Sequence, residues 1–221
     1  MIVCLPDDLP AQALTTHTLD RHFAVAGALT PQFWAIPALR LWQRRHLIGP
    51  RTGRRASCAG GPLRLLDLDG MRHAAALGAG IRHQLWQRVV HGTRPAAPWH
   101  TFHARHQAHT ATYPIDRART DFCRQPRITA IRMHNAATPP AAHLRTAELE
   151  MFQAGPMAYQ HYTASTAICG DALLTADGHT LAPVSNTFTD RITYLHNAHR
   201  ALDTLPPDQR LVALAVSSPA A

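Results

Sequence analysis

Lysine is absent from this chain of 221 residues, and all 22 of its basic residues are arginines. Acidic residues are also few, because only 14 aspartates and glutamates are present and the formal net charge is +8. Charged residues make up 16% of the chain and hydrophobic residues 46%. This composition excludes a disordered, charge-rich tail and provides enough apolar material for a packed core. From the length we expect a single domain over residues 1–221.

Two targeting features are also missing from the sequence. The chain contains no long run of consecutive apolar residues, so we predict no membrane-spanning helix and no membrane partner. Its first ten residues, MIVCLPDDLP, lack the basic start and the apolar stretch of a signal peptide. The four cysteines form no CxxC pair, which fits free thiols in a reducing compartment. We therefore predict a cytoplasmic protein with no structural metal and no cofactor.

The densest basic segment is RLWQRRHLIGPRTGRRAS, residues 40–57, and no acidic residue occurs between Asp20 and Asp67. Arginine suits phosphate because its planar fork forms paired hydrogen bonds and keeps its charge. Trp42 adds a surface on which a base can stack. A loop that contacts only water is the alternative, but such surfaces usually mix charges of both signs. We predict that the segment binds a phosphate backbone through Arg40, Arg44, Arg45, Arg51, Arg54, Arg55 and Trp42.

Charge is also distributed unevenly along the chain. Residues 1–135 hold 18 arginines and 7 aspartates, a net charge of +11. Residues 136–221 hold 4 arginines and 7 acidic residues, a net charge of −3. A basic half indicates a polyanionic partner, and the mildly acidic remainder suggests contacts with other protein subunits.

Apolar patterning and turn residues predict a mixture of helices and strands. Residues 62–68 read as a strand, and residues 30–46 read as a helix kinked at Pro37. The remaining expected elements are strands at 1–5, 22–29 and 210–216, helices at 69–91, 113–125 and 190–202, a loop at 47–62, and a hairpin of strands 129–134 and 145–152. Neither a regular βαβ order nor a G-x-G-x-x-G motif is present. We therefore predict an α+β fold with a small, largely antiparallel sheet and long loops rich in proline and glycine.

The helix at 69–91 has the clearest pattern in the chain. Asp69 is its expected N-cap, and His83 is expected on its polar face. The expected buried face consists of Met71, Ala74, Ala75, Gly78, Ile81, Leu85 and Val89.

Histidines recur at every third position in PWHTFHARHQAHT, at residues 100, 103, 106 and 109. On an α-helix these four side chains fan round the axis and cannot all reach one metal ion. We expect a row that faces solvent or nucleic acid. One alternative is a metal-independent endoribonuclease in which His103 or His106 acts as general acid or base.

Two pairs of aspartates provide a second alternative. Asp67 and Asp69 follow an apolar run in RLLDLDGM, and Asp171 and Asp177 lie in AICGDALLTAD. The two segments resemble the DxDG and GD motifs of haloacid dehalogenase-type phosphotransferases. The resemblance implies Mg²⁺-dependent phosphoryl chemistry, with one aspartate as nucleophile and its neighbour as acid or base. The lysine of that family has no counterpart here, and the aspartates can equally serve as a helix cap and turn residues.

The leading interpretation is a nucleic-acid-binding protein without its own catalysis, with RNA favoured over DNA. We expect it to be one subunit of a nucleoprotein complex, such as an RNA-guided effector or a complex that processes mobile DNA.

Overall fold

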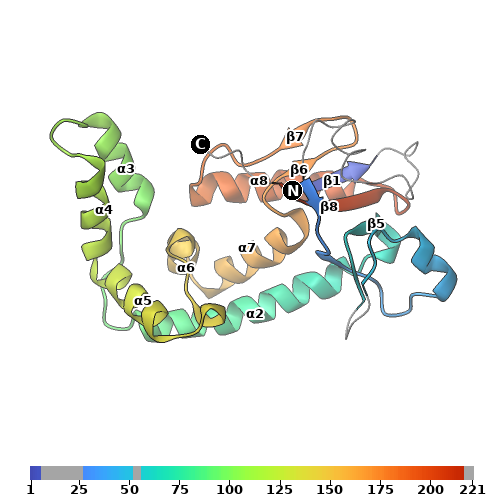
Figure 1. Ribbon diagram of the computed structural model, residues 1–221, viewed down its shortest axis with the longest axis horizontal. Helices are drawn as coiled ribbons and strands as arrows, with labels where there is room; N and C mark the ends of the chain where they lie inside the picture. The colour runs from blue at the N-terminus through green and yellow to red at the C-terminus, as the bar shows by residue number, and fades with distance from the viewer. Residues whose placement is uncertain (6–26, 52–55, 217–221) are drawn as a thin grey trace. The chain divides into compact units, whose positions relative to one another are not determined.

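Residues 1–5, 27–51 and 56–216 are described by the computed structural model, which divides into two units (Figure 1). The first unit comprises residues 1–75, 163–185 and 189–221, and the second comprises residues 76–162 and 186–188. The single domain expected from the length stays a prediction. In the described part of the chain, no helix has the length and apolar character required to cross a membrane.

The main sheet belongs to the first unit and is organised round its last strand. The described strands are β1 (Ile2–Leu5), β2 (Gly27–Leu29), β3 (Phe33–Trp34), β4 (Ser57–Cys58), β5 (Gly60–Pro62), β6 (Leu173–Leu174), β7 (Thr180–Leu181) and β8 (Arg210–Val216). Strand β8 pairs antiparallel with β1, β2 and β5. Strand β1 continues the sheet through a parallel pairing with β6, which pairs antiparallel with β7, and β3 and β4 form a separate antiparallel pair. The predicted α+β class with a largely antiparallel sheet is confirmed.

Close packing of β5 against β8 depends on glycine. A Cβ atom at Gly60 would lie 1.9 Å from the Leu211 carbonyl oxygen, so any other residue would force the strands apart. The apolar core of the unit includes side chains of this sheet. The core comprises Val3, Leu5, Ile48, Ala59, Leu174, Val212 and Leu214. Burial of these side chains is the main stabilising contribution in the first unit.

The helices are, in chain order, α2 (Leu68–Val89), α3 (Trp99–Ala108), α4 (Ile115–Arg124), α5 (Pro126–Ala137), α6 (Leu149–Gln153), α7 (Pro156–Cys169) and α8 (Phe188–Asp203), with 3₁₀ helices η2 (Leu41–His46), η3 (Leu63–Leu65), η4 (Pro140–Ala142) and η5 (Thr146–Glu148). In the second unit α3 and α4 lie side by side (Figure 1), and the Phe122 ring contacts Trp99 and Phe102 edge-on. The core of that unit is aromatic, since Phe152 stacks on both Trp86 and Tyr159. The predicted helices at 69–91, 113–125 and 190–202 and the strands at 1–5 and 210–216 are confirmed.

Three predictions near the first sheet are wrong in whole or in part. Within the loop expected at 47–62, Ser57–Cys58 form β4 and Gly60–Pro62 form β5, because both segments pair with distant strands. Residues 30–46 form β3 and η2 instead of one kinked helix, because the fully buried Phe33 pairs with Cys58 across strands. Pro31 and Pro37 also lack the N–H groups that a continuous helix requires. In place of the strand expected at 62–68, Pro62 ends β5, Leu63–Leu65 form η3, and α2 starts at Leu68. Of the strand expected at 22–29, residues 27–29 form β2, and residues 22–26 lie outside the described residues.

The predicted hairpin of strands 129–134 and 145–152 is also wrong. These residues form α5 and the helices η5 and α6. Helix α5 starts at Pro126, whose fixed φ suits the first helical position. In α6 the adjacent residues Met151 and Phe152 are both buried, which a strand with one solvent-exposed face does not allow.

Helix α2 exists as predicted, but its buried face and its cap differ. The buried side chains of the helix are Met71, Ala79, His83 and Trp86, whereas Leu77 and Ile81 are 58% and 70% exposed. His83 is buried because its Nε2 atom lies 3.1 Å from the Phe152 carbonyl oxygen and its ring packs on Trp86. The N-cap is Asp67, not Asp69, since Asp67 Oδ1 accepts a hydrogen bond from the Gly70 N–H at 3.0 Å.

The cap can be tested by substitution. Asp67→Ala should lower the free energy of unfolding by about 1 kcal/mol, because one N–H group at the start of the helix loses its acceptor. For a protein of this size that corresponds to a fall of about 2–4 °C in Tm. Asp67→Asn should retain most of the stability, since asparagine caps as well as aspartate. Asp69→Ala should cost less, because Asp69 is exposed and only pairs with Arg72. Thermal unfolding showing equal losses in Asp69→Ala and Asp67→Ala would refute this assignment.

Candidate nucleic-acid interface

The basic segment begins with the short helix η2, and none of the six residues of this helix is buried. Gln43 closes its first turn in both directions. The Gln43 Oε1 atom accepts the Arg40 N–H at 2.9 Å, and the Gln43 N–H donates to the Arg40 carbonyl at 2.9 Å. At the other end the Leu47 N–H donates to the Arg44 carbonyl at 3.1 Å. The backbone of η2 is therefore internally bonded while its side chains are exposed.

Two buried residues connect η2 to the sheet. Leu47 and Ile48 immediately follow η2, and both are buried. The Ile48 N–H donates to the Gly60 carbonyl at 2.8 Å, and the Ala59 N–H donates to the Ile48 carbonyl at 2.8 Å. Since Ile48 also belongs to the core, the exposed basic helix is held on a packed base.

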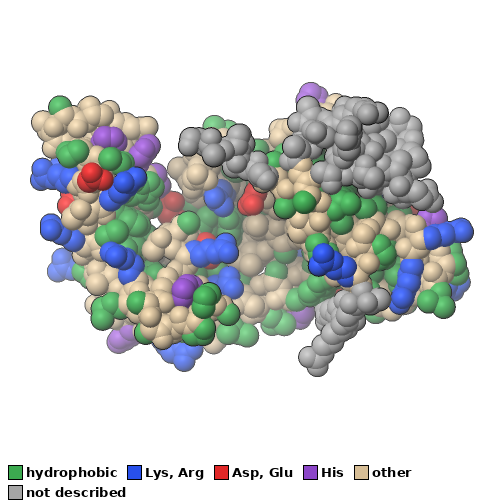
Figure 2. Space-filling model, viewed as in Figure 1, with side chains coloured by type: hydrophobic (Ala, Val, Ile, Leu, Met, Phe, Trp, Pro, Cys, Tyr) green, Lys and Arg blue, Asp and Glu red, His purple; other side chains and the backbone are tan. Residues whose placement is uncertain are grey.

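The positive charge of this segment is not neutralised within the described part of the chain. Arg40, Arg44, Arg45 and Arg51 are exposed, and no described carboxylate lies within 4.0 Å of their guanidinium groups. Other exposed arginines are paired with acids, as in Arg64–Asp208, Arg72–Asp69 and Arg119–Asp116. Basic side chains gather over this segment at the right of the view (Figure 2). Arg54 and Arg55 lie outside the described residues.

Apolar side chains are exposed beside these arginines. Trp42 is 55% exposed and Leu41 is 81% exposed, and both lie on η2. A large exposed aromatic ring in the same short segment as arginines without a described carboxylate partner provides both stacking area and charge. We call Arg40, Trp42, Arg44, Arg45 and Arg51 the η2 surface.

Three members of the histidine row, His100, His103 and His106, lie on α3, His109 is its C-cap, and their environments differ. His106 Nδ1 lies 2.9 Å from the Tyr113 carbonyl, and the Tyr113 hydroxyl donates to Asp121 at 2.9 Å. His103 is half-buried, with its ring 6.0 Å from that of Trp99 and 6.4 Å from that of His106. His106 thus contacts the backbone of the segment that connects α3 to α4. The rows of side chains do not converge on one point, and no feature of this geometry favours a ribonuclease centre.

The aspartates of the phosphohydrolase alternative serve local roles. Asp67 caps α2, Asp69 pairs with Arg72 at 3.1 Å, and Asp177 lies 3.6 Å from His179 in a turn. Asp171 is exposed at the turn that follows α7. Within residues 1–5, 27–51 and 56–216, no group of three histidine, cysteine or acidic side chains is placed to hold a metal ion. The arrangement therefore gives no support to this alternative.

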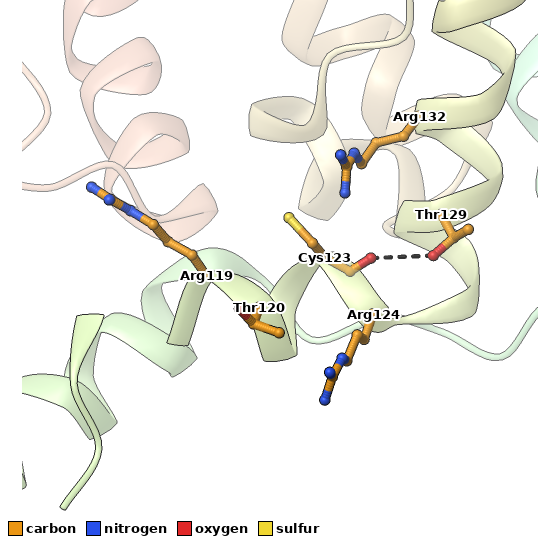
Figure 3. A pocket seen from close by; sticks show the side chains of 6 residues that line it. All are labelled: Arg119, Thr120, Cys123, Arg124, Thr129 and Arg132. Carbon is orange, nitrogen blue, oxygen red and sulfur yellow. Dashed lines mark hydrogen bonds between the residues drawn. The ribbon is translucent and has the colours of Figure 1, made fainter. Parts of the chain in front are cut away.

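A second basic site, absent from the sequence-based predictions, lies where α4 meets α5. Arg119, Arg124 and Arg132 line an open hollow of about 520 Å³ together with Thr120, Cys123 and Thr129 (Figure 3). Basic side chains are also visible over α4 and α5 at the left of Figure 2. The second unit as a whole contains ten arginines and four acidic residues. The arginines at 119, 124 and 132 could have indicated the site. It was missed because residues 129–134 were expected to form a strand, which separated Arg132 from the helix that carries the other two.

Comparison with known proteins adds no assignment, because no protein-family model matches the chain and no curated protein or solved structure shows significant similarity to it.

The cysteines give a prediction that checks the burial pattern. Burial raises the pKa of the Cys4 and Cys58 thiols to about 11 and that of Cys169 to about 12. Since the thiolate is the reactive form, these three should react slowly near neutral pH, whereas Cys123 is half-buried beside arginines. Iodoacetamide should therefore modify one thiol per native chain quickly and four after denaturation. Peptide mass mapping should place the fast site at Cys123, and Cys123→Ser should abolish it. Fast labelling of Cys4 or Cys58 would contradict the packing described here.

Proposed function

We propose that this protein binds the phosphate backbone of a single-stranded nucleic acid through the η2 surface, with RNA preferred over DNA. The observation that carries the proposal is the set of four exposed arginines without a described carboxylate partner, in a segment that also exposes Trp42 on the anchored helix η2. A guanidinium binds phosphate oxygens through two parallel hydrogen bonds. The tryptophan ring supplies the stacking surface that unpaired bases require.

RNA is favoured because its loops and ends present unstacked bases that protein aromatic rings can bind. A duplex would keep its bases stacked and would use the arginines alone. Backbone contacts of this kind position a strand but do not read its sequence. We therefore propose weak sequence preference, with no catalytic step.

We further propose that the protein works as one subunit of a nucleoprotein complex in the cytoplasm. The support is the uneven charge of the chain, in which a mildly acidic C-terminal region accompanies a basic N-terminal region. The acidic region does not suit a polyanion, so it is available for contacts with protein subunits.

Salt dependence tests the arginines. Each phosphate neutralised on a single strand contributes a slope of about −0.7 to log K against log salt concentration, because condensed counterions are released. Replacing Arg44, Arg45 and Arg51 together by alanine should flatten this slope by about two units. The measurement is fluorescence anisotropy of labelled oligouridylate across a range of salt concentrations, with Tm as a check on folding.

A charge-matched variant separates contact from net charge. The control replaces Arg94, Arg145 and Arg200 by alanine. These arginines are also exposed, so the control removes the same three positive charges elsewhere on the protein. This control should keep nearly the wild-type slope. If both triple variants remain folded and lose equal slope, or if neither loses any, then the η2 surface does not contact phosphate.

Stacking is tested separately from charge. Trp42→Ala should lower the affinity about tenfold, since one base–aromatic stack contributes about 1–3 kcal/mol. The salt slope should stay unchanged, because no charge is removed, and Trp42→Phe should restore most of the affinity. Leu41→Ala is the control, as Leu41 is more exposed than Trp42 but offers no ring. An equal loss of affinity in Leu41→Ala and Trp42→Ala would argue against stacking, as would no loss in Trp42→Ala.

A further inference from the structure

The hollow between α4 and α5 is formed by a corner with fixed geometry. Gln125 joins the two helices, and its side chain both accepts from the Ala97 N–H at 2.7 Å and donates to the Ala97 carbonyl at 3.0 Å. Across the corner, the Thr129 hydroxyl donates to the Cys123 carbonyl at 3.1 Å (Figure 3). Beneath it, Ala118, Ile128 and Ile131 are fully buried. The side chains that line the hollow thus project from a well-packed support.

Charge in this hollow is of one sign. Arg119 is paired with Asp116 at 3.4 Å, but no described carboxylate lies within 4.0 Å of Arg124 or Arg132. The neighbouring Arg127 has a different role, because it donates to Gln153 Oε1 and to Thr93 and lies over the Trp86 ring. Arg124 and Arg132 therefore remain free to bind an anion.

The other polar groups in the hollow restrict what can bind. The Thr120 hydroxyl donates to the Asp116 carbonyl at 2.8 Å, and the Thr129 hydroxyl donates to Cys123, so both hydroxyl hydrogens are already used. Apart from the weak S–H donor of Cys123, the hydrogen-bond donors in the hollow are then the guanidinium groups, which favours an acceptor-rich anion such as phosphate.

The guanidinium groups are spread round the rim. Arg132 extends toward Cys123 from α5, whereas Arg124 and Arg119 point away in different directions (Figure 3). A single phosphate cannot bridge groups that diverge, but a chain of phosphates can contact them in turn. We propose that this hollow binds consecutive phosphate groups of a nucleic-acid strand. The choice of ligand rests on the proposed function, while the site lies in the second unit and is separate from the η2 surface.

Cys123 provides a reporter inside this site, because it lines the hollow and is the one cysteine that is not buried. A strand bound there should shield its thiol from the neutral reagent iodoacetamide. With oligouridylate at about ten times its dissociation constant, alkylation of Cys123 should slow about tenfold, in proportion to the unoccupied fraction. Inorganic phosphate at matched ionic strength should give little protection.

Variants assign the effect to the arginines. Arg124→Ala combined with Arg132→Ala should abolish the protection, compared in each variant as the ratio of rates with and without oligonucleotide. Arg94→Ala combined with Arg145→Ala removes the same charge from the second unit outside the hollow and should leave protection intact. Arg124→Lys combined with Arg132→Lys should give only partial protection of Cys123, since lysine lacks the paired donors of arginine.

Each result decides between the two sites. Oligouridylate that binds by anisotropy without slowing Cys123 alkylation, or protection that survives in Arg124→Ala/Arg132→Ala, overturns the inference and leaves the η2 surface untouched. Protection of Cys123 with no effect of the η2 substitutions on affinity supports the hollow and overturns the proposed function of η2. Equal protection by inorganic phosphate overturns the requirement for consecutive phosphates, and no binding in either assay overturns both proposals.

Discussion

The close approach of Gly60 to Leu211 is the constraint on which the first unit depends. Because residue 60 has no Cβ atom, β5 can lie against β8, which already pairs with β1 and β2. The carbonyl of the same Gly60 accepts the Ile48 N–H, and Ile48 lies within the basic segment, two residues after the end of η2. A larger residue at position 60 would therefore disturb the sheet and the base of the η2 surface together. The exposed arginines contribute little to this packing, so they are free to be selected for a ligand.

Elements with a strong local signal could be predicted from the sequence. Strands β1 and β8 are short apolar runs, and helices α2, α4 and α8 combine apolar periodicity with clear ends. The α+β class follows from these elements alone. Residues 33–34 and 57–58 could not be assigned, because their pairing is between segments more than twenty residues apart and each strand is only two residues long. For residues 33–34, tertiary pairing decided the structure against the local helix signal.

Periodicity was misleading where helices are short or buried on an unexpected side. The alternating apolar residues at 147, 149 and 151 resemble the pattern of a strand. However, the neighbouring residues Met151 and Phe152 are both buried, because a helix can place two consecutive side chains against the core. In α2 the histidine at position 83 looked like a surface residue. It is buried because the Phe152 carbonyl lies within hydrogen-bonding distance of its ring, a contact between residues far apart in the chain. A sequence does not show such a partner, so a polar residue on the buried face could not be predicted.

The candidate sites illustrate the same limit of sequence patterns in a chain that has arginine but no lysine. Arginines 40, 44, 45 and 51 were predicted as a surface because local acids are missing, and their exposure agrees with that expectation. The arginines at 119, 124, 127 and 132 lie close together in sequence on α4 and α5 but differ in use. Arg127 turns inward to Thr93, Gln153 and Trp86, and burial lowers its pKa. Arg119 meets a carboxylate, whereas Arg124 and Arg132 meet none in the described chain. Partners, not spacing, thus separate the arginines that hold the fold from those available to a ligand, and partners become visible only when α4 and α5 are placed against their neighbours.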